Sequence, residues 1–148
     1  MTGKELRKEA LVEASVEQVW AMWTTEEGLR FMSSESRVQL EPGGDYALFL
    51  NQPADDWGKR GSEGSRIVSV DPPHRLVFDW TFSPETPGLR AAGDTTLVTV
   101  TVEPDAEQTR VTLVATGWKG GSEWDEGYAY FDRAWDHVFK RLREVAGS

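Results

Sequence analysis

The chain has 148 residues, a common size for one domain, and 16 basic against 25 acidic residues give it a formal net charge of −9. A molecule of this charge repels polyanions, and no basic stripe is visible, so we expect no nucleic-acid partner and no anionic membrane partner. The complete lack of cysteine excludes disulfides, thiolate catalysis and thiolate metal sites.

No apolar run approaches the roughly 20 residues that span a bilayer, and the positive charges of the first nine residues precede no apolar stretch. We therefore expect a cytoplasmic protein with a single domain over residues 1–148. Seven Trp, six Phe and three Tyr predict a core rich in large rings.

The N-terminal part predicts one strand followed by two short helices. Apolar residues alternate imperfectly over residues 6–14, which indicates a strand. Ser15 and Gln18 have the spacing of a capping box, so a helix should begin there. The Thr-Thr-Glu-Glu run at 24–27 repeats the start signal, and a second short helix should continue to Met32.

A series of five or six strands should follow. Proline and paired glycines at 41–44 supply the turn of a hairpin between strands at 37–40 and 45–50. Polar and proline-containing runs at 51–61 and 84–88 are typical of loops. The remaining strands are expected at residues 62–70, 74–82, 95–103 and 109–116.

The C-terminal segment carries the strongest periodic signal. From Ser122 to Gly147, apolar side chains recur at spacings of three and four, which predicts one amphipathic helix of roughly 36 Å. The stripe reads as aromatic in its first half and aliphatic afterwards, which favours a cavity under the first half. The expected stripe is Trp124, Tyr128, Phe131, Trp135, Val138, Leu142 and Val145.

Meandering strands with helices on one face define an α+β fold, in which a curved antiparallel sheet wraps around the long C-terminal helix. The element order and several local strings resemble the Hsp90-ATPase-activator-homologue (AHSA1-like) branch of the START/Bet v 1-like (SRPBCC) superfamily. The matching strings lie at residues 19–29, 42–44, 60–67, 75–80, 117–118 and 124–131.

This resemblance implies a helix-grip fold with a deep apolar cavity between the sheet and the C-terminal helix. Family members include lipid, hormone and polyketide binders, cyclases, oxygenase subunits and a co-chaperone domain, so the fold follows from the resemblance more closely than the function does.

The aromatic residues expected between sheet and helix either line a ligand cavity or fill an ordinary core. Polar candidates for orienting a ligand are Glu63 and Arg66, although charges beside glycines also occur in simple turns. The candidate cavity residues are Trp23, Phe31, Phe49, Phe78, Trp80, Trp118, Trp124, Tyr128, Phe131 and Trp135.

No catalytic residue can be named, because no nucleophile motif and no distinctive pair of carboxylates is present. His74 and His137 lack the spacing of metal ligands, so we expect no metal and no cofactor. Three functions stay open: binding of a hydrophobic or aromatic small molecule, a cyclase-like or hydrolase-like enzyme acting on such a molecule, and an interaction with an Hsp90-like chaperone.

Overall fold

The computed structural model describes residues 5–33, 36–48, 65–82 and 87–146. Along the chain the elements are β1 (Leu6–Val12), α1 (Val16–Thr24), the 3₁₀ helix η1 (Gly28–Phe31), β2 (Ser36–Val38), β3 (Tyr46–Leu48), β4 (Ile67–Asp71), β5 (Arg75–Thr81), α2 (Pro87–Ala92), β6 (Thr95–Asp105), β7 (Gln108–Thr116) and α3 (Ser122–Ala146).

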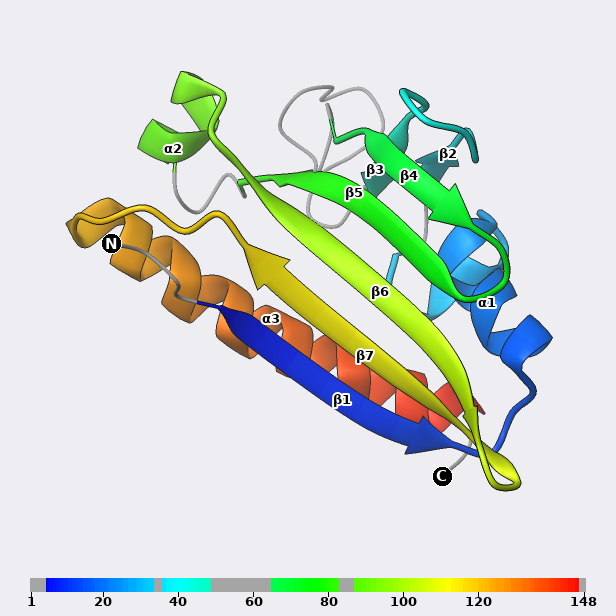
Figure 1. Cartoon of the computed structure of the whole chain (residues 1–148). Coiled ribbons are helices and arrows are strands. Elements are labelled where there is room, and N and C mark those ends of the chain that lie inside the picture. Colours follow the sequence, from blue (N-terminus) through cyan, green and yellow to red (C-terminus); the bar gives the residue numbers. More distant parts are fainter. Residues whose placement is uncertain (1–4, 34–35, 49–64, 83–86, 147–148) are drawn as a thin grey trace.

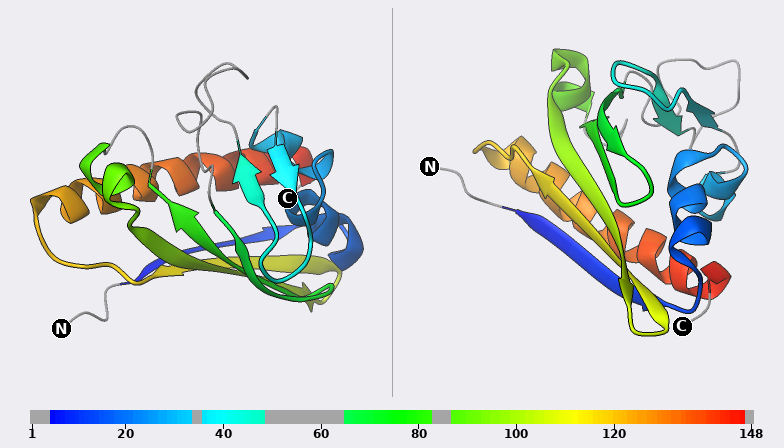
Figure 2. Two further views of the ribbon diagram at one scale, coloured as in Figure 1. Left: turned by 90° about the horizontal axis from the view of Figure 1, so that it is seen from above. Right: turned by 45° about the vertical axis from the view of Figure 1, so that its right-hand side comes forward.

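Within the described residues, five strands form one antiparallel sheet in the order β1-β7-β6-β5-β4. Helix α3 runs along one face of this sheet, and α1 lies at one end of the same face (Figures 1 and 2). This arrangement confirms the predicted α+β fold with a curved sheet around a long C-terminal helix.

The hairpin of β2 and β3 forms as predicted, but it is a separate two-stranded sheet. Its link to the main sheet is the bridge between Asp45 and Arg66, where Ile67 donates its backbone N–H to the Gly44 carbonyl oxygen at 2.9 Å. Gly43 has a φ of +86°, a conformation that favours glycine, so the paired glycines do provide the turn.

The start of α1 has the predicted capping box. The Ser15 hydroxyl accepts from the backbone N–H of Gln18 at 3.0 Å, and the Gln18 side chain accepts from the backbone N–H of Ser15 at 2.8 Å. The second short helix forms at Gly28–Phe31, but its N-cap residue Glu27 makes no side-chain capping bond, so the run at 24–27 does not cap it as expected. The Thr25 hydroxyl accepts the backbone N–H of Gly28 at 2.9 Å. The Thr24 hydroxyl instead donates to the Trp20 carbonyl oxygen.

Helix α2 corrects the expected loop near residues 84–88. Its first residue is Pro87, and a proline at the first helical position loses no helical hydrogen bond. Gly93, at a φ of +77°, follows the helix and matches the glycine that often ends one. The two residue types that indicated a loop are here the start and stop of a short helix whose Leu89 is buried.

The inward stripe of α3 differs from the prediction in its second half. Phe139 is only 2% exposed and Val138 is half-buried, whereas Val145 is 55% exposed. At about 100° per residue, Phe139 lies about 40° around the helix from Trp135, while Val145 lies about 80° away. The predicted change from rings to aliphatic side chains is therefore wrong, because a phenylalanine continues the stripe.

A lysine connects β1 to α3. Lys8 shares the inward face of β1 with Leu6 and Ala10, and its Nζ lies 2.6 Å from an Asp132 oxygen and 2.7 Å from an Asp136 oxygen. Desolvation opposes the charge of this ammonium, but hydrogen bonds and the charges of both aspartates outweigh it and raise the pKa of Lys8. The two aspartates are one helical turn apart, so together they clamp α3 to β1.

Among the described helices, none is both long and apolar enough to cross a membrane.

We predict that Phe139→Ala lowers the free energy of unfolding by about 3–5 kcal/mol, because it leaves a void beside the buried ring of Trp23. The control Val145→Ala, on the same helix, should change the free energy of unfolding by about 0.5 kcal/mol or less, because Val145 is exposed. Urea unfolding followed by circular dichroism measures both. Equal losses for the two variants would contradict the observed orientation of α3.

We predict that Lys8→Gln lowers the free energy of unfolding by about 1 kcal/mol at neutral pH, because glutamine cannot neutralise Asp132 and Asp136. Since the folded-state pKa of Lys8 is raised above 10.5, its contribution is complete below pH 10.5 and is lost as the pH rises through the folded-state value.

Urea unfolding from about pH 8 to about pH 12 should therefore show the gap between wild type and Lys8→Gln closing only at the alkaline end. The control is Lys119→Gln, whose partner Asp94 lies 3.5 Å from a lysine side chain that is 67% exposed, and it should change the free energy little at any pH. If wild type and Lys8→Gln had the same free energy of unfolding at pH 8, the ion pairs of Lys8 with Asp132 and Asp136 would not stabilise the fold.

Candidate functional site

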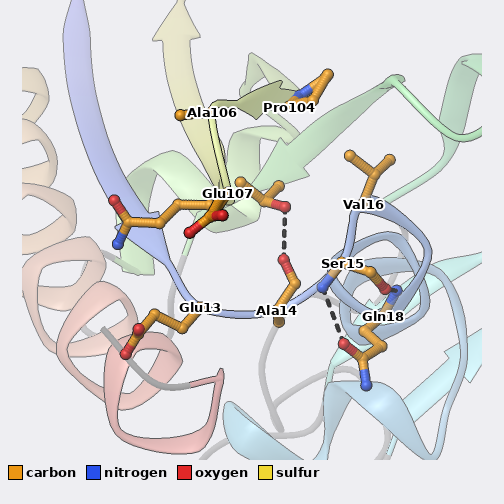
Figure 3. Close-up of a pocket in the computed structure, with 10 residues that line it drawn as sticks. Glu13, Ala14, Ser15, Val16, Gln18, Pro104, Ala106 and Glu107 are labelled. Carbon is orange, nitrogen blue, oxygen red and sulfur yellow. Dashed lines mark hydrogen bonds between the residues drawn. The ribbon is translucent and has the colours of Figure 1, made fainter.

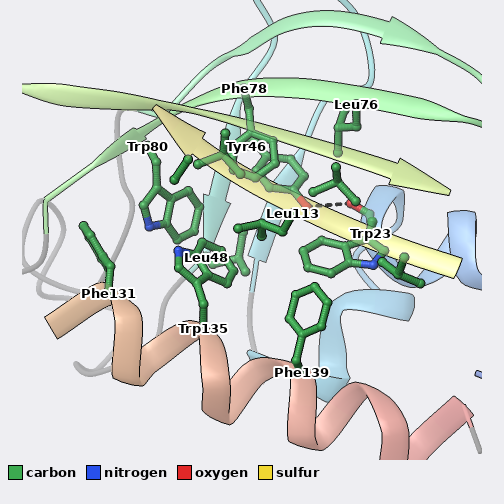
Figure 4. Packing of buried hydrophobic residues seen from close by; sticks show 14 of the residues in the cluster. Trp23, Tyr46, Leu48, Leu76, Phe78, Trp80, Leu113, Phe131, Trp135 and Phe139 are labelled. Atoms are coloured by element: carbon green, nitrogen blue, oxygen red, sulfur yellow. Dashed lines mark hydrogen bonds between the residues drawn. The ribbon is translucent and has the colours of Figure 1, made fainter. Parts of the chain in front are cut away.

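The candidate site is the aromatic interior between α3 and the inner face of the sheet (Figure 4). Most of the ring residues expected there are buried, and Phe49 and Glu63 lie outside the described residues. The buried members of the predicted set are Trp23, Phe31, Phe78, Trp80, Trp118, Trp124, Phe131 and Trp135.

One set of contacting rings, which we call the Trp135 group, comes from α1, η1, β3, β5 and α3. The ring centroids of Trp80 and Trp135 are 5.3 Å apart, and those of Trp23 and Trp135 are 6.5 Å apart. These contacts bring side chains more than 100 positions apart in the sequence to one place. The members are Trp23, Phe31, Tyr46, Phe78, Trp80, Trp135 and Phe139.

A second set, the Trp118 group, packs beside the first half of α3. The Phe82 ring lies 5.0 Å from that of Trp124 and 5.5 Å from that of Phe131. A Cβ added to Gly127 would lie 2.7 Å from the Phe82 ring, so glycine at this position of α3 permits the close approach. The members are Phe82, Trp118, Trp124, Tyr128, Tyr130 and Phe131.

Tyr128 lies at the edge of this group. It is half-buried, and its hydroxyl donates to the Glu5 carbonyl oxygen at 3.2 Å, while its ring contacts Trp118. Trp118 itself donates its indole N–H to the Ala115 carbonyl oxygen at 3.0 Å. Both residues therefore have structural contacts that account for their positions.

Sequence reasoning missed three rings of the interior, namely Tyr46, Phe82 and Phe139. Phe82 could have been found, because it continues the two-residue period of Leu76, Phe78 and Trp80. Tyr46 and Leu48 on β3 are both fully buried, but Ala47 between them is buried as well, so this strand has no alternating pattern. Phe139 fits the helical period, as described above.

Tyr46 is a fully buried ionisable side chain within the Trp135 group. Its ring centroid is 4.3 Å from that of Phe78, and its hydroxyl donates to the Trp23 carbonyl oxygen at 2.6 Å. Burial raises the pKa of Tyr46 far above its ordinary value, so this hydroxyl keeps its proton. It fixes β3 to α1 as a hydrogen-bond donor.

Arg66 is not part of the interior. Its guanidinium lies 2.7 Å from an Asp45 oxygen, and its side chain is 55% exposed. Its backbone N–H donates to an Asp79 carboxylate oxygen at 2.8 Å. The residue stabilises the junction between the β2–β3 hairpin and the main sheet, and its polar head faces solvent.

A pocket of about 410 Å³ lies away from the aromatic interior, where β1 meets α1 and the β6–β7 turn (Figure 3). Its lining has no aromatic side chain and includes the carboxylates of Glu13 and Glu107. Its polar groups take part in local structure, because the Thr109 hydroxyl donates to the Ala14 carbonyl oxygen at 2.6 Å and Ser15 belongs to the capping box. None of the predicted site residues lines it.

In the described part of the chain, no three His, Asp or Glu side chains gather in a way that could hold a metal ion. Besides Lys8 and Tyr46, the pKa of Glu144 is shifted; it is lowered by the hydrogen bond that this exposed carboxylate accepts from Arg141. These shifts belong to a clamp, a buried donor and a surface ion pair.

A curved antiparallel sheet that grips a long C-terminal helix over an aromatic interior defines the helix-grip class, which is also called START/Bet v 1-like. Within this class the chain belongs to the Activator of Hsp90 ATPase homolog 1-like protein family, because the sequence model of that family matches residues 13–147. This family is consistent with a ligand-binding or a co-chaperone role. No curated protein sequence matches the chain.

Solved structures show the same fold over nearly the whole chain. Protein BH1534 of Bacillus halodurans is 27% identical, with 99% of each chain covered and a TM-score of 0.70. The Aha1 dimer of Colwellia psychrerythraea is 15% identical, with 97% of this chain and 96% of that chain covered and a TM-score of 0.74. Protein MLL2253 of Mesorhizobium loti is 16% identical, with 96% of each chain covered and a TM-score of 0.74.

Proposed function

We propose that the chain binds a hydrophobic or aromatic small molecule between the sheet and α3. The observation that carries this proposal is the concentration of thirteen contacting rings on the inner sides of α1, η1, β3, β5 and α3, and around the start of α3. Flat, rigid side chains of this kind offer large apolar faces to a flat ligand.

The polar content of the interior also supports an apolar ligand. Besides the Tyr46 hydroxyl and the indole N–H groups, the buried polar side chains of the described residues are serines and threonines: Thr24, Ser33, Ser65, Thr96, Thr109 and Thr112. A charged ligand would lose its hydration without gaining an opposite charge among them, which costs several kcal/mol or more. The bound molecule is therefore neutral.

A reaction on such a ligand, of cyclase or hydrolase type, is a further step that the described residues do not support. Tyr46 is the ionisable group with a shifted pKa within the rings, and its proton is used in the bond to the Trp23 carbonyl oxygen. Binding alone accounts for the interior.

We predict saturable binding of N-phenyl-1-naphthylamine, a neutral aromatic probe whose fluorescence rises in an apolar site. Trp135→Leu should weaken it about tenfold, because the variant removes a ring that contacts both Trp80 and Trp23. The control Val145→Ala changes the exposed face of the same helix and should bind like wild type. A fluorescence titration with circular dichroism as a folding check measures this, and no saturable signal in folded wild type would overturn the proposal.

A co-chaperone role is the second candidate, and the observations that favour it are the family description and the likeness to the Aha1 dimer. If small-molecule binding is the function, adding the purified protein to Hsp90 should leave the rate of ATP hydrolysis unchanged. The measurement is a coupled ATPase assay with increasing amounts of this protein. A saturable stimulation of several-fold would favour the co-chaperone role instead.

A further inference from the structure

The interior contains indole N–H groups that have no acceptor. The N–H of Trp23 is fully buried and makes no hydrogen bond within the described structure. Among the described residues, the indole N–H groups of Trp80 and Trp135 also make no hydrogen bond, and the two residues are only 4% and 3% exposed. Of these three indoles of the described structure, only that of Trp23 has its nitrogen both fully buried and unpaired. Trp118, by contrast, has its acceptor in the Ala115 carbonyl oxygen.

Trp80 and Trp135 form a contacting pair from opposite walls of the interior. Trp80 projects from β5 and Trp135 from α3, and their ring centroids are 5.3 Å apart at an interplanar angle of 43°. Figure 4 shows both indole nitrogens at the same edge of this pair, on the side that faces Phe131. Two N–H groups therefore point from the sheet and the helix toward one region, at the junction of the two ring groups.

A fourth polar group without a partner, a threonine hydroxyl, belongs to the neighbouring strand β6. Thr96 lies directly opposite Trp80 in the β5–β6 register, and its side chain is on the inner face with those of Val98 and Val100. Its hydroxyl is buried and makes no hydrogen bond among the described residues. Buried polar groups without partners are uncommon, because each costs about 1–3 kcal/mol.

We propose that the indole N–H groups of Trp80 and Trp135 together donate to one acceptor oxygen of the bound molecule. This inference rests on the proposed function and specifies its ligand class as neutral aromatic compounds that carry a carbonyl oxygen. A carbonyl oxygen has two lone pairs and can accept both N–H groups, and it brings no charge into an interior whose buried polar side chains are uncharged. Rings of the ligand then pack on those of Phe131 and the indoles.

Two probes of the same shape test the proposal. In 2-acetylnaphthalene a carbonyl oxygen occupies the place of the terminal CH₂ of 2-isopropenylnaphthalene, so the two differ in the acceptor alone. We expect the ketone to bind wild type about tenfold more tightly, as two modest hydrogen bonds would give. Isothermal titration calorimetry of the full chain measures both dissociation constants.

The matched variants are Trp80→Phe with Trp135→Phe, against Trp20→Phe as the control. Trp20 is a buried tryptophan of α1 that belongs to neither ring group, and this variant makes the same change of side chain. The double variant should bind the two naphthalenes with equal affinity, whereas the control should keep the preference for the ketone.

A second measurement uses wild type alone and so does not depend on the stability of the variants. In the ¹⁵N–¹H spectrum, saturating ketone should shift the indole N–H protons of Trp80 and Trp135 downfield relative to saturating hydrocarbon. Equal affinities with no such difference would overturn the paired donors and leave the proposed function intact. Failure of both probes to bind would overturn the proposed function and this inference with it.

Discussion

The packing of α3 against the sheet is the interaction on which the rest of the structure depends. Burial of Trp124, Phe131, Trp135, Phe139 and Leu142, at about 1.5–3 kcal/mol each, contributes on the order of 10 kcal/mol, which is comparable with the entire net stability of a domain. Because the helix supplies much of the core, its rings connect α1 and β5, through Phe139 against Trp23 and Trp135 against Trp80. The Lys8 clamp fixes where along β1 the helix lies.

Much of this fold could be predicted from the sequence, because long periodic segments carry their own signal. The strand alternation of β5 to β7, the capping box at Ser15 and the existence of α3 each depend on neighbours a few residues away, and all were confirmed. One error arose where one residue type has two roles. Pro87 and Gly93 are typical of a loop, and they are also the start and stop of α2.

The candidate site was less predictable, because a period identifies the buried face of an element but not what that face contacts. The first half of the α3 stripe could be predicted from the sequence, yet the pairing of Trp135 with Trp80 depends on how β5 and α3 lie in space. Lys8 interrupts an apolar face of β1, and only the position of Asp132 and Asp136 explains it. Likewise, nothing in the sequence around Arg66 indicated that its partner is Asp45.

Under the proposed function, the aromatic interior both stabilises the fold by packing and binds a ligand, and the two roles favour different side chains. A core built only for stability would leave no indole N–H without an acceptor, since phenylalanine provides a similar apolar face without a polar atom. Under the proposed function, tryptophan at positions 80 and 135 provides two N–H donors that phenylalanine lacks. Only a ligand with an acceptor oxygen gives these donors a partner, so the two side chains would favour the complex over the empty protein.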